Sequence, residues 1–265
     1  MGKVLELPEC YESLRPRIEK TLRPFIRITA EKGSTGRFDC KFGGDPYFPL
    51  DAEYPCDETG HPMKLLAQIN FEQIPTLPLF PTSGILQFYL SVKDDSYGFD
   101  YGKGYEQKNF RALFFEKPIK DEDKLKKDFE FAKLSEEDEF PIFSGCEAKL
   151  TFTKDEEYMS IGDFRLEKDC GIKGNEWKPE LEDFYNKCYD AALGHKIAGY
   201  PGFAQNDPRG EMEQLSGFTH LLLQIDSDDK IDCEWGDGGV GNFFITEEDL
   251  KKKDFSKVLY NYDCC

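Results

Sequence analysis

Long apolar runs are missing from this sequence of 265 residues. No stretch approaches the roughly 20 consecutive apolar residues of a membrane-spanning helix, and the first residues lack the apolar core of a signal peptide. The sequence therefore predicts a cytoplasmic protein that does not contact a membrane. The 23 Phe and 13 Tyr supply enough large apolar side chains to exclude a disordered chain.

Patterns of metal ligands are also missing. The nine cysteines form no C-x-x-C pair, and only Cys264 and Cys265 are close together, without a neighbouring histidine. Structural zinc takes four converging Cys or His ligands, usually supplied as closely spaced pairs. We therefore expect free thiols, no metal and no cofactor. The three histidines stand in no catalytic motif, so structural roles are expected for them.

Basic residues are outnumbered. The chain has 34 Lys and Arg against 52 Asp and Glu, a formal net charge of −18. Nucleic acids and anionic membranes are polyanions that bind through Lys and Arg, so the charge argues against both as partners. An acidic surface would attract a basic protein partner. The alternative is a solvated surface with no partner.

Two parts of the chain resemble each other in three blocks. KFGGDPYF matches KIAGYPGF, LLAQIN matches LLLQID, and GILQFY matches GVGNFF. The pairs begin at Lys41 and Lys196, at Leu65 and Leu221, and at Gly84 and Gly239. Because the spacing between partners is almost constant, the blocks predict an internal duplication, with repeats over about 25–116 and 195–265 in a single domain of 1–265.

The expected fold class is α+β. Apolar and alternating runs predict strands at residues 25–29, 65–71, 85–92, 109–116, 149–152 and 158–166. Helices are expected at 8–22, bent or broken at Pro16, at 179–193, and after Thr246, which begins a capping box. The duplication would form two similar β-units about a pseudo-twofold axis, with peripheral helices. Residues 117–140 are charge-dense and predict a surface excursion.

The segment from Trp235 to Gly239 combines an aromatic side chain, a carboxylate and glycines that expose backbone amides. Two carboxylates flanking an indole, here Glu234 and Asp237, could act as a glycosidase pair, with the indole stacked on a sugar. The alternative places Trp235 in the core and leaves Asp237 to bond turn amides. We expect Trp235 and Asp237 to lie beside a groove of the duplicated fold, with Tyr200 nearby.

Gln68 and Gln224 occupy equivalent places in the apolar blocks LLAQIN and LLLQID. A buried carboxamide must find hydrogen-bond partners, because an unsatisfied one costs about 1–3 kcal/mol. Either each glutamine ties its strand to a neighbouring loop, or the two form a polar pair facing a cleft. The predicted ligand-binding residues are therefore Gln68, Tyr200, Gln224, Trp235 and Asp237.

Two further segments match known binding motifs in residue spacing, but their sequence context does not fit. Residues 236–241 fit G-x-G-x-x-G, but a strand-like NFFI follows where a dinucleotide site needs a helix. Asp226, Asp228 and Asp232 resemble a calcium loop, yet the required glycine is Ile231. We expect turns at both places.

The chain resembles the YwqG-like family, a bacterial domain family of unknown function. The blocks that carry the resemblance are KFGGDPYFP, LLAQINFEQIP with FPTSGILQFYL, AGYPGFAQ, LLLQIDSD and EWGDGGVGNFFITEEDL. The resemblance implies a cytoplasmic α+β protein with an internal duplication. Some members of that family are suspected immunity or interaction components of bacterial toxin systems, which fits the acidic charge without being shown by it. It supplies no catalytic residues.

The function expected from the sequence is a non-enzymatic binding or regulatory module for a protein partner. The alternative is a small-molecule or carbohydrate-binding protein, or a hydrolase, with a cleft near Trp235 and Asp237. The sequence does not decide whether a reaction is catalysed.

Overall fold

A computed structural model describes residues 5–101, 104–143, 145–173 and 178–265 of the chain. The strands are β1 (Arg23–Lys32), β2 (Lys41–Gly43), β3 (Lys64–Asn70), β4 (Ile85–Leu90), β5 (Phe110–Phe115), β6 (Glu147–Glu157), β7 (Lys196–Ala198), β8 (His220–Asp226), β9 (Val240–Ile245) and β10 (Leu259–Asp263). The α-helices are α1 (Arg15–Ile18), α2 (Leu166–Cys170), α3 (Glu182–Ala192), α4 (Pro208–Glu211) and α5 (Glu247–Lys252). The short 3-10 helices are η1 (Glu9–Leu14), η2 (Glu19–Thr21), η3 (Glu122–Lys124), η4 (Glu130–Ala132), η5 (Pro179–Leu181), η6 (Glu213–Leu215) and η7 (Asp229–Ile231).

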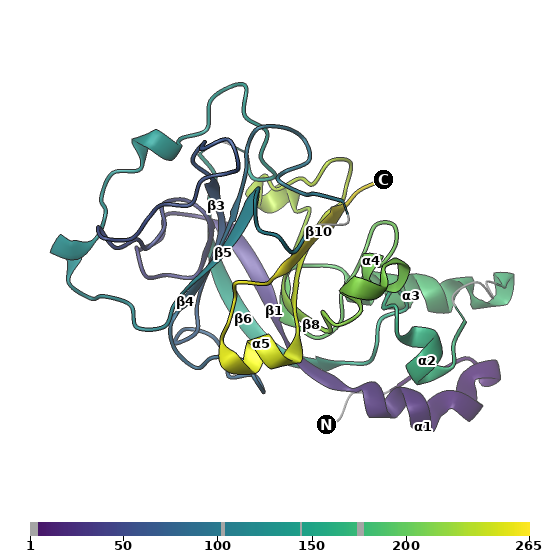
Figure 1. Cartoon of the computed structure of the whole chain (residues 1–265). Helices are drawn as coiled ribbons and strands as arrows, with labels where there is room; N and C mark the ends of the chain where they lie inside the picture. Colours follow the sequence, from purple (N-terminus) through teal and green to yellow (C-terminus); the bar gives the residue numbers. More distant parts are fainter. Residues whose placement is uncertain (1–4, 102–103, 144, 174–177) are drawn as a thin grey trace.

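The ten strands form one antiparallel sheet in the order β10-β9-β8-β7-β1-β6-β2-β3-β4-β5. The expected fold class, an α+β duplication of two β-units, is therefore wrong. The physical reason is the central pair: β1 and β6 stay in register over ten residues, from Arg23 opposite Glu157 to Lys32 opposite Ala148. This long ladder joins the strands on either side into a continuous sheet, and the helices are a minor addition to it (Figure 1).

The sheet curls until its two ends approach each other, which makes it barrel-like. Phe88 of β4 and Phe243 of β9 are far apart in the strand order, yet their ring centroids are 4.6 Å apart. The rings of Phe110 in β5 and Tyr260 in β10, the two edge strands, are 5.3 Å apart. Because aromatic side chains bury large apolar areas, this layer closes a core that both ends of the sheet share.

The similar sequence blocks have similar local pairing inside this sheet. Lys41 of β2 is opposite Gln68 of β3, and Lys196 of β7 is opposite Gln224 of β8. A register shift interrupts the β3–β4 ladder after Leu65, and another interrupts the β8–β9 ladder. These local similarities do not divide the molecule into two units.

The helices lie mostly at one side of the sheet, on the right in Figure 1. The capping box predicted at Thr246 is confirmed, since its side chain accepts a hydrogen bond from the backbone N–H of Asp249 at 3.1 Å. The helix predicted at 179–193 is confirmed as η5 followed by α3, and the one at 8–22 is broken into η1, α1 and η2. Among the described residues, no helix combines the length and the apolar character that crossing a membrane requires.

The strand predicted at 158–166 is wrong. β6 ends at Glu157, and α2 begins at Leu166. Between them, an oxygen of Asp163 accepts a hydrogen bond from the backbone N–H of Arg165 at 3.0 Å. Such local bonds from an aspartate to the following backbone favour a turn over an extended strand.

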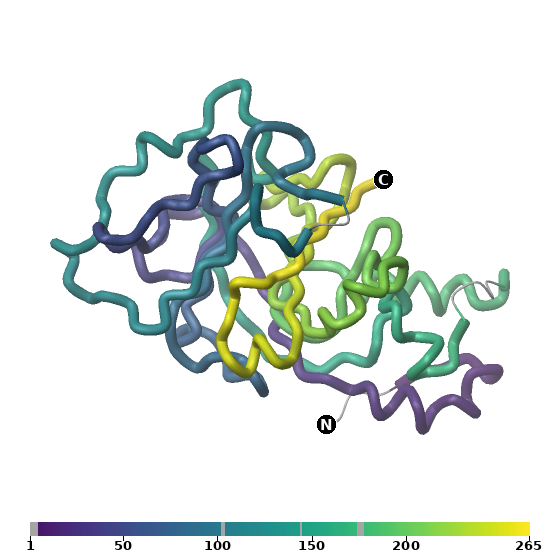
Figure 2. Tube along the Cα trace, in the orientation of Figure 1, coloured from purple at the N-terminus to yellow at the C-terminus, as the bar shows by residue number. Residues whose placement is uncertain are grey.

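Residues 117–140 leave the sheet after β5 and return shortly before β6, along the outside of the molecule (Figure 2). Most of their charged side chains are exposed, as expected for a surface excursion. Two apolar side chains anchor the segment, because Leu125 is 1% exposed and Phe129 is 6% exposed. The excursion is therefore held against the sheet, where it forms one wall of a cavity.

Candidate functional site

A cavity of about 450 Å³ lies between the ends of β2, β3 and β6 and the excursion. It is lined by Thr35, Arg37, Lys41, Gly43, Gly44, Asp45, Pro46, Lys64, Lys127, Phe129, Lys133, Leu134, Phe140, Ile142, Phe143, Gly145, Cys146 and Glu147. Five of these residues are basic and two are acidic, in a chain whose net charge is −18. The cavity therefore reverses the charge balance of the molecule.

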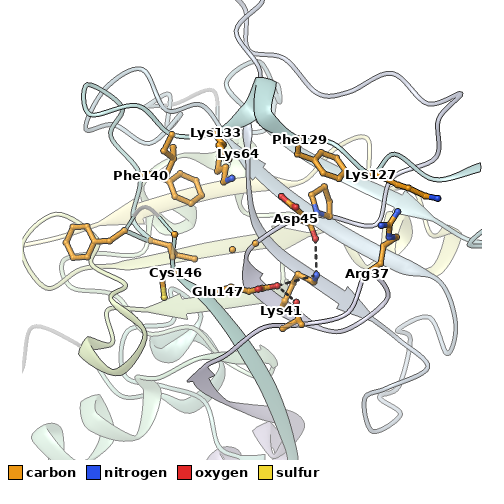
Figure 3. Close-up of a pocket in the computed structure, with 18 residues that line it drawn as sticks. Arg37, Lys41, Asp45, Lys64, Lys127, Phe129, Lys133, Phe140, Cys146 and Glu147 are labelled. Carbon is orange, nitrogen blue, oxygen red and sulfur yellow. Dashed lines mark hydrogen bonds and ion pairs between the residues drawn. The ribbon is translucent and has the colours of Figure 1, made fainter. Parts of the chain in front are cut away.

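Lys41 lies on the floor of the cavity, on the short strand β2 (Figure 3). Only 1% of this residue is exposed. Its ammonium donates a hydrogen bond to the backbone oxygen of Asp45 at 2.9 Å and lies 3.7 Å from an oxygen of Glu147. Burial lowers the pKa of Lys41, and the nearby Glu147 opposes that shift. The charge on the floor is thus only partly compensated.

Lys64 begins β3 and faces the cavity from the side opposite Lys41 (Figure 3). The residue is half-buried. Among the described residues, its ammonium forms neither an ion pair nor a hydrogen bond. Burial lowers the pKa of Lys64, and the charge of Asp45 acts against that shift. A desolvated cation without a partner is costly, and an anion in the cavity would relieve that cost.

The rim carries two exposed lysines, each with its own carboxylate. The ammonium of Lys127 is 3.4 Å from Asp123, and that of Lys133 is 2.5 Å from Glu130. Such exposed pairs contribute about 0–1 kcal/mol each, so both lysines stay free to turn toward a ligand.

Arg37 connects the two walls of the cavity. It lies in the loop between β1 and β2, and its guanidinium donates a hydrogen bond to the backbone oxygen of Lys126 in the excursion at 2.9 Å. The amide of Gln68 donates a hydrogen bond to the backbone oxygen of Arg37, also at 2.9 Å. A buried strand residue therefore holds the loop that carries this cation.

Two glycines allow β2 to end close against β6. Gly43 and Gly44 have φ values of +65° and +67°, in the region that other residues rarely adopt. A Cβ on Gly43 would lie 2.6 Å from the backbone oxygen of Cys146, and a Cβ on Gly44 would lie 2.6 Å from an oxygen of Glu147. The glycine pair of KFGGDPYF thus brings Lys41 and Glu147 to the same floor.

The five residues predicted from the sequence to bind a ligand do not line this cavity. Gln68 and Gln224 lie in β3 and β8 and are 0% exposed. Gln68 accepts a hydrogen bond from the backbone N–H of Tyr47 at 2.8 Å, and Gln224 accepts one from that of Gly202 at 2.7 Å. Each amide also donates to two backbone oxygens, so each glutamine ties its strand to neighbouring loops.

The other three predicted residues lie apart from the cavity as well. Trp235 is 0% exposed, with its ring centroid 5.8 Å from that of Tyr97. Tyr200 is 1% exposed, its hydroxyl donates to the backbone oxygen of Thr21 at 2.6 Å, and burial raises its pKa to about 12. Asp237 is exposed in a turn. The ligand-binding role of these residues stays a prediction.

Sequence reasoning missed the cavity residues Lys41, Lys64 and Glu147. The available signal was the block KFGGDPYF, whose glycines mark a close approach of two strands. Lys64, at the start of LLAQIN, and Glu147 are brought to it only by the order of the strands in the sheet.

The cavity lining includes one cysteine. None of the nine cysteines, all of them described, forms a disulfide. Cys146 lines the cavity, but its thiol donates a hydrogen bond to the backbone oxygen of Ile231 at 2.8 Å, and burial raises its pKa. No group of three or more His, Cys, Asp or Glu within the described ranges is placed to hold a metal ion.

The structure thus defines a strand-rich, barrel-like domain with a basic cavity at one side of its sheet. The chain belongs to the family described as a domain of unknown function, DUF1963, whose model matches residues 40–264. That range contains β2 to β10 and the whole cavity lining except Thr35 and Arg37. No curated protein matches the chain.

Proposed function

We propose that this protein is a non-enzymatic binding module that takes up an anionic small molecule in the basic cavity. The observation that carries this proposal is Lys64, a half-buried ammonium that faces the cavity and has no partner among the described residues. Lys41 adds a second buried cation on the floor. Ligand pockets of comparable size, about 300–1,000 Å³, commonly combine apolar walls with a few placed polar groups.

Binding is favoured over catalysis by the lining itself. The described lining contains no histidine. The raised pKa of Cys146 keeps that residue in its thiol form, which is a poor nucleophile. The strongest feature of the cavity is its positive charge, and a positive cavity selects anions.

The charge distribution favours a second proposal, a basic protein partner. Because the cavity holds more cations than anions, the rest of the surface is still more acidic than the net charge of −18 indicates. An acidic surface raises the rate of encounter with a basic protein. A role as a YwqG-like immunity or interaction protein in the bacterial cytoplasm is the finer form of this proposal. The two proposals concern different surfaces and do not exclude each other.

Isothermal titration calorimetry with 1-naphthalenesulfonate tests the cavity proposal. We expect the wild-type protein to bind this anion and not neutral 1-naphthalenemethanol, which has a similar apolar body. The variant Lys64→Met keeps most of the aliphatic stem, removes the charge and should weaken sulfonate binding. Lys257→Met, at an exposed position outside the cavity, is the matched control. Equal binding of the charged and neutral compounds would contradict the proposal.

A further inference from the structure

The cations of the cavity differ in whether a carboxylate lies close to them. Lys41 and the two rim lysines each have a carboxylate oxygen within 4 Å, at the distances given above. Arg37 and Lys64 do not, because neither forms an ion pair among the described residues. The carboxylate of Asp45 also lines the cavity, and its charge acts on Lys64. The cavity therefore has two cations outside any ion pair of the described residues, with the carboxylate of Asp45 in the same lining.

These two charges approach the cavity from separate elements. Arg37 comes from the loop before β2, and Lys64 comes from the first position of β3 (Figure 3). Both elements are fixed: Gln68 holds the backbone of Arg37, and Lys64 is opposite Leu90 in the β3–β4 ladder. A site that is held in place before its ligand arrives loses less entropy on binding.

Part of the cavity lining is apolar. It consists of Phe129 and Leu134 from the excursion and of Phe140 and Ile142 from the segment that leads into β6. Phe129, Phe140 and Ile142 are 6%, 8% and 2% exposed, so the core holds them in place. A ligand that fills the cavity would place an apolar body against this part of the lining while its charge meets the lysines.

We propose that the ligand is a doubly charged anion with an apolar body, of the class of aryl phosphate monoesters. This inference rests on the proposed function of the cavity and specifies its ligand. A phosphate monoester carries a charge of about −1.5 to −2 at pH 7 and three strong acceptor oxygens, so it can pair with both Arg37 and Lys64, the two cations outside any ion pair of the described residues. A carboxylate or a sulfonate carries a single charge and would leave one cation without a partner.

The test compares three probes by calorimetry at pH 7.5: 1-naphthyl phosphate, 1-naphthalenesulfonate and inorganic phosphate. We expect naphthyl phosphate to bind at least about tenfold more tightly than either of the others. The sulfonate has the apolar body with one charge, and inorganic phosphate has the charge without the body. At pH 5 the phosphate monoester is singly charged, because its second pKa is about 6. Its affinity should then fall to that of the sulfonate.

Variants test the part of the proposal that concerns charge. Lys64→Met should make naphthyl phosphate bind no more tightly than the sulfonate binds the wild-type protein, and Arg37→Met should have the same effect. Lys257→Met should leave all affinities unchanged. Lys64→Met removes a cation outside any ion pair, so the fold should survive it. Arg37→Met also removes the hydrogen bond to the backbone oxygen of Lys126, so circular dichroism checks the fold of both variants.

Each failure has its own signature. If the sulfonate binds wild-type protein as tightly as naphthyl phosphate does, the doubly charged ligand is wrong and the anion-binding function stands. If inorganic phosphate binds as tightly as naphthyl phosphate, the apolar body is wrong. If neither naphthyl anion binds, the proposed function of the cavity fails together with this inference.

Discussion

Lys41 and Lys196 have similar positions in the sheet and different surroundings. Each begins a three-residue strand, is 1% exposed and is opposite a buried glutamine. The ammonium of Lys196 lies 3.1 and 3.2 Å from the two oxygens of Glu157, whose side chain is 8% exposed. The ammonium of Lys41 is 3.7 Å from Glu147, whose side chain is 26% exposed, and it faces the cavity. Lys196 is held by its own carboxylate, and Lys41 lines the cavity.

The backbone accounts for much of this difference. Glu157 also accepts a hydrogen bond from the backbone N–H of Tyr200 at 2.6 Å, so its carboxylate is held over Lys196. Glu147 instead accepts a hydrogen bond from the hydroxyl of Thr35, in the loop that lines the cavity. The element that holds the carboxylate therefore decides whether a buried lysine on a short strand is fully paired within the fold or is left facing a cavity.

The largest effect is expected from Glu157→Gln. This change leaves Lys196 as a buried charge without its carboxylate, and breaking such a pair costs about 3–5 kcal/mol. The matched change Glu147→Gln removes a longer contact, 3.7 Å, from a carboxylate that is 26% exposed, so it should cost less than Glu157→Gln. Urea unfolding of both variants measures the difference. Equal losses would mean that Glu157 and Glu147 contribute equally to stability, which contradicts the difference between the two lysine sites.

The two glutamines give the next largest effect. Gln68→Leu and Gln224→Leu each leave buried backbone groups without partners, and we expect each to lower the free energy of unfolding by about 2–3 kcal/mol. Only Gln68 holds the backbone of Arg37, so only Gln68→Leu should also weaken binding of naphthyl phosphate. Calorimetry on both variants checks this. Weakened binding in Gln224→Leu would contradict the assignment of the cavity to one side of the sheet.

The free energy of unfolding should depend on pH through His220 in β8, whereas ligand binding in the cavity should not. Burial and the nearby Arg23 lower the pKa of His220, in β8, to about 4, against about 6.5 in an unfolded chain. Between these values the unfolded state binds a proton that the folded state does not, so acidification destabilises the fold. The loss from this residue should be up to about 2 kcal/mol between pH 7 and pH 5.

The variant His220→Gln isolates this contribution. Urea unfolding at pH 7 and pH 5 should show that the variant loses less stability on acidification than the wild-type protein. Parallel losses in the two proteins would show that His220 does not titrate as described. The cavity lining contains no histidine among the described residues, so binding of the sulfonate should hardly change over the same range.

The local features of the fold could be predicted from the sequence. Apolar runs locate β3 and β4, and the capping box at Thr246 locates α5, because these signals lie within a few residues. The fold class could not be predicted in the same way. It depends on the ten-residue ladder between β1 and β6, whose strands are more than a hundred residues apart in the chain. Similar blocks favoured two units, and long-range pairing joined them into one sheet.

The candidate site was even harder to predict from the sequence than the fold class. The block KFGGDPYF contains Lys41 and the glycine pair, but a lysine next to glycines has no charge signature of its own. Lys64 and Glu147 become neighbours of Lys41 only because β3 and β6 flank β2. The sequence favoured Trp235, since it joins an aromatic ring to glycines and a carboxylate, and the structure buries that ring completely.

The smallest effect is expected from Asp237→Asn. Asp237 is exposed, and among the described residues its carboxylate forms no hydrogen bond, so the change should alter the free energy of unfolding by less than about 0.5 kcal/mol. If the carboxylate capped the turn, the loss would instead be about 0.5–2 kcal/mol. The same variant tests the site predicted from the sequence. Weaker binding of a ligand or protein partner without loss of stability would support a role for Asp237, whereas unchanged binding of naphthyl phosphate is expected if the cavity beside Lys64 is the binding site.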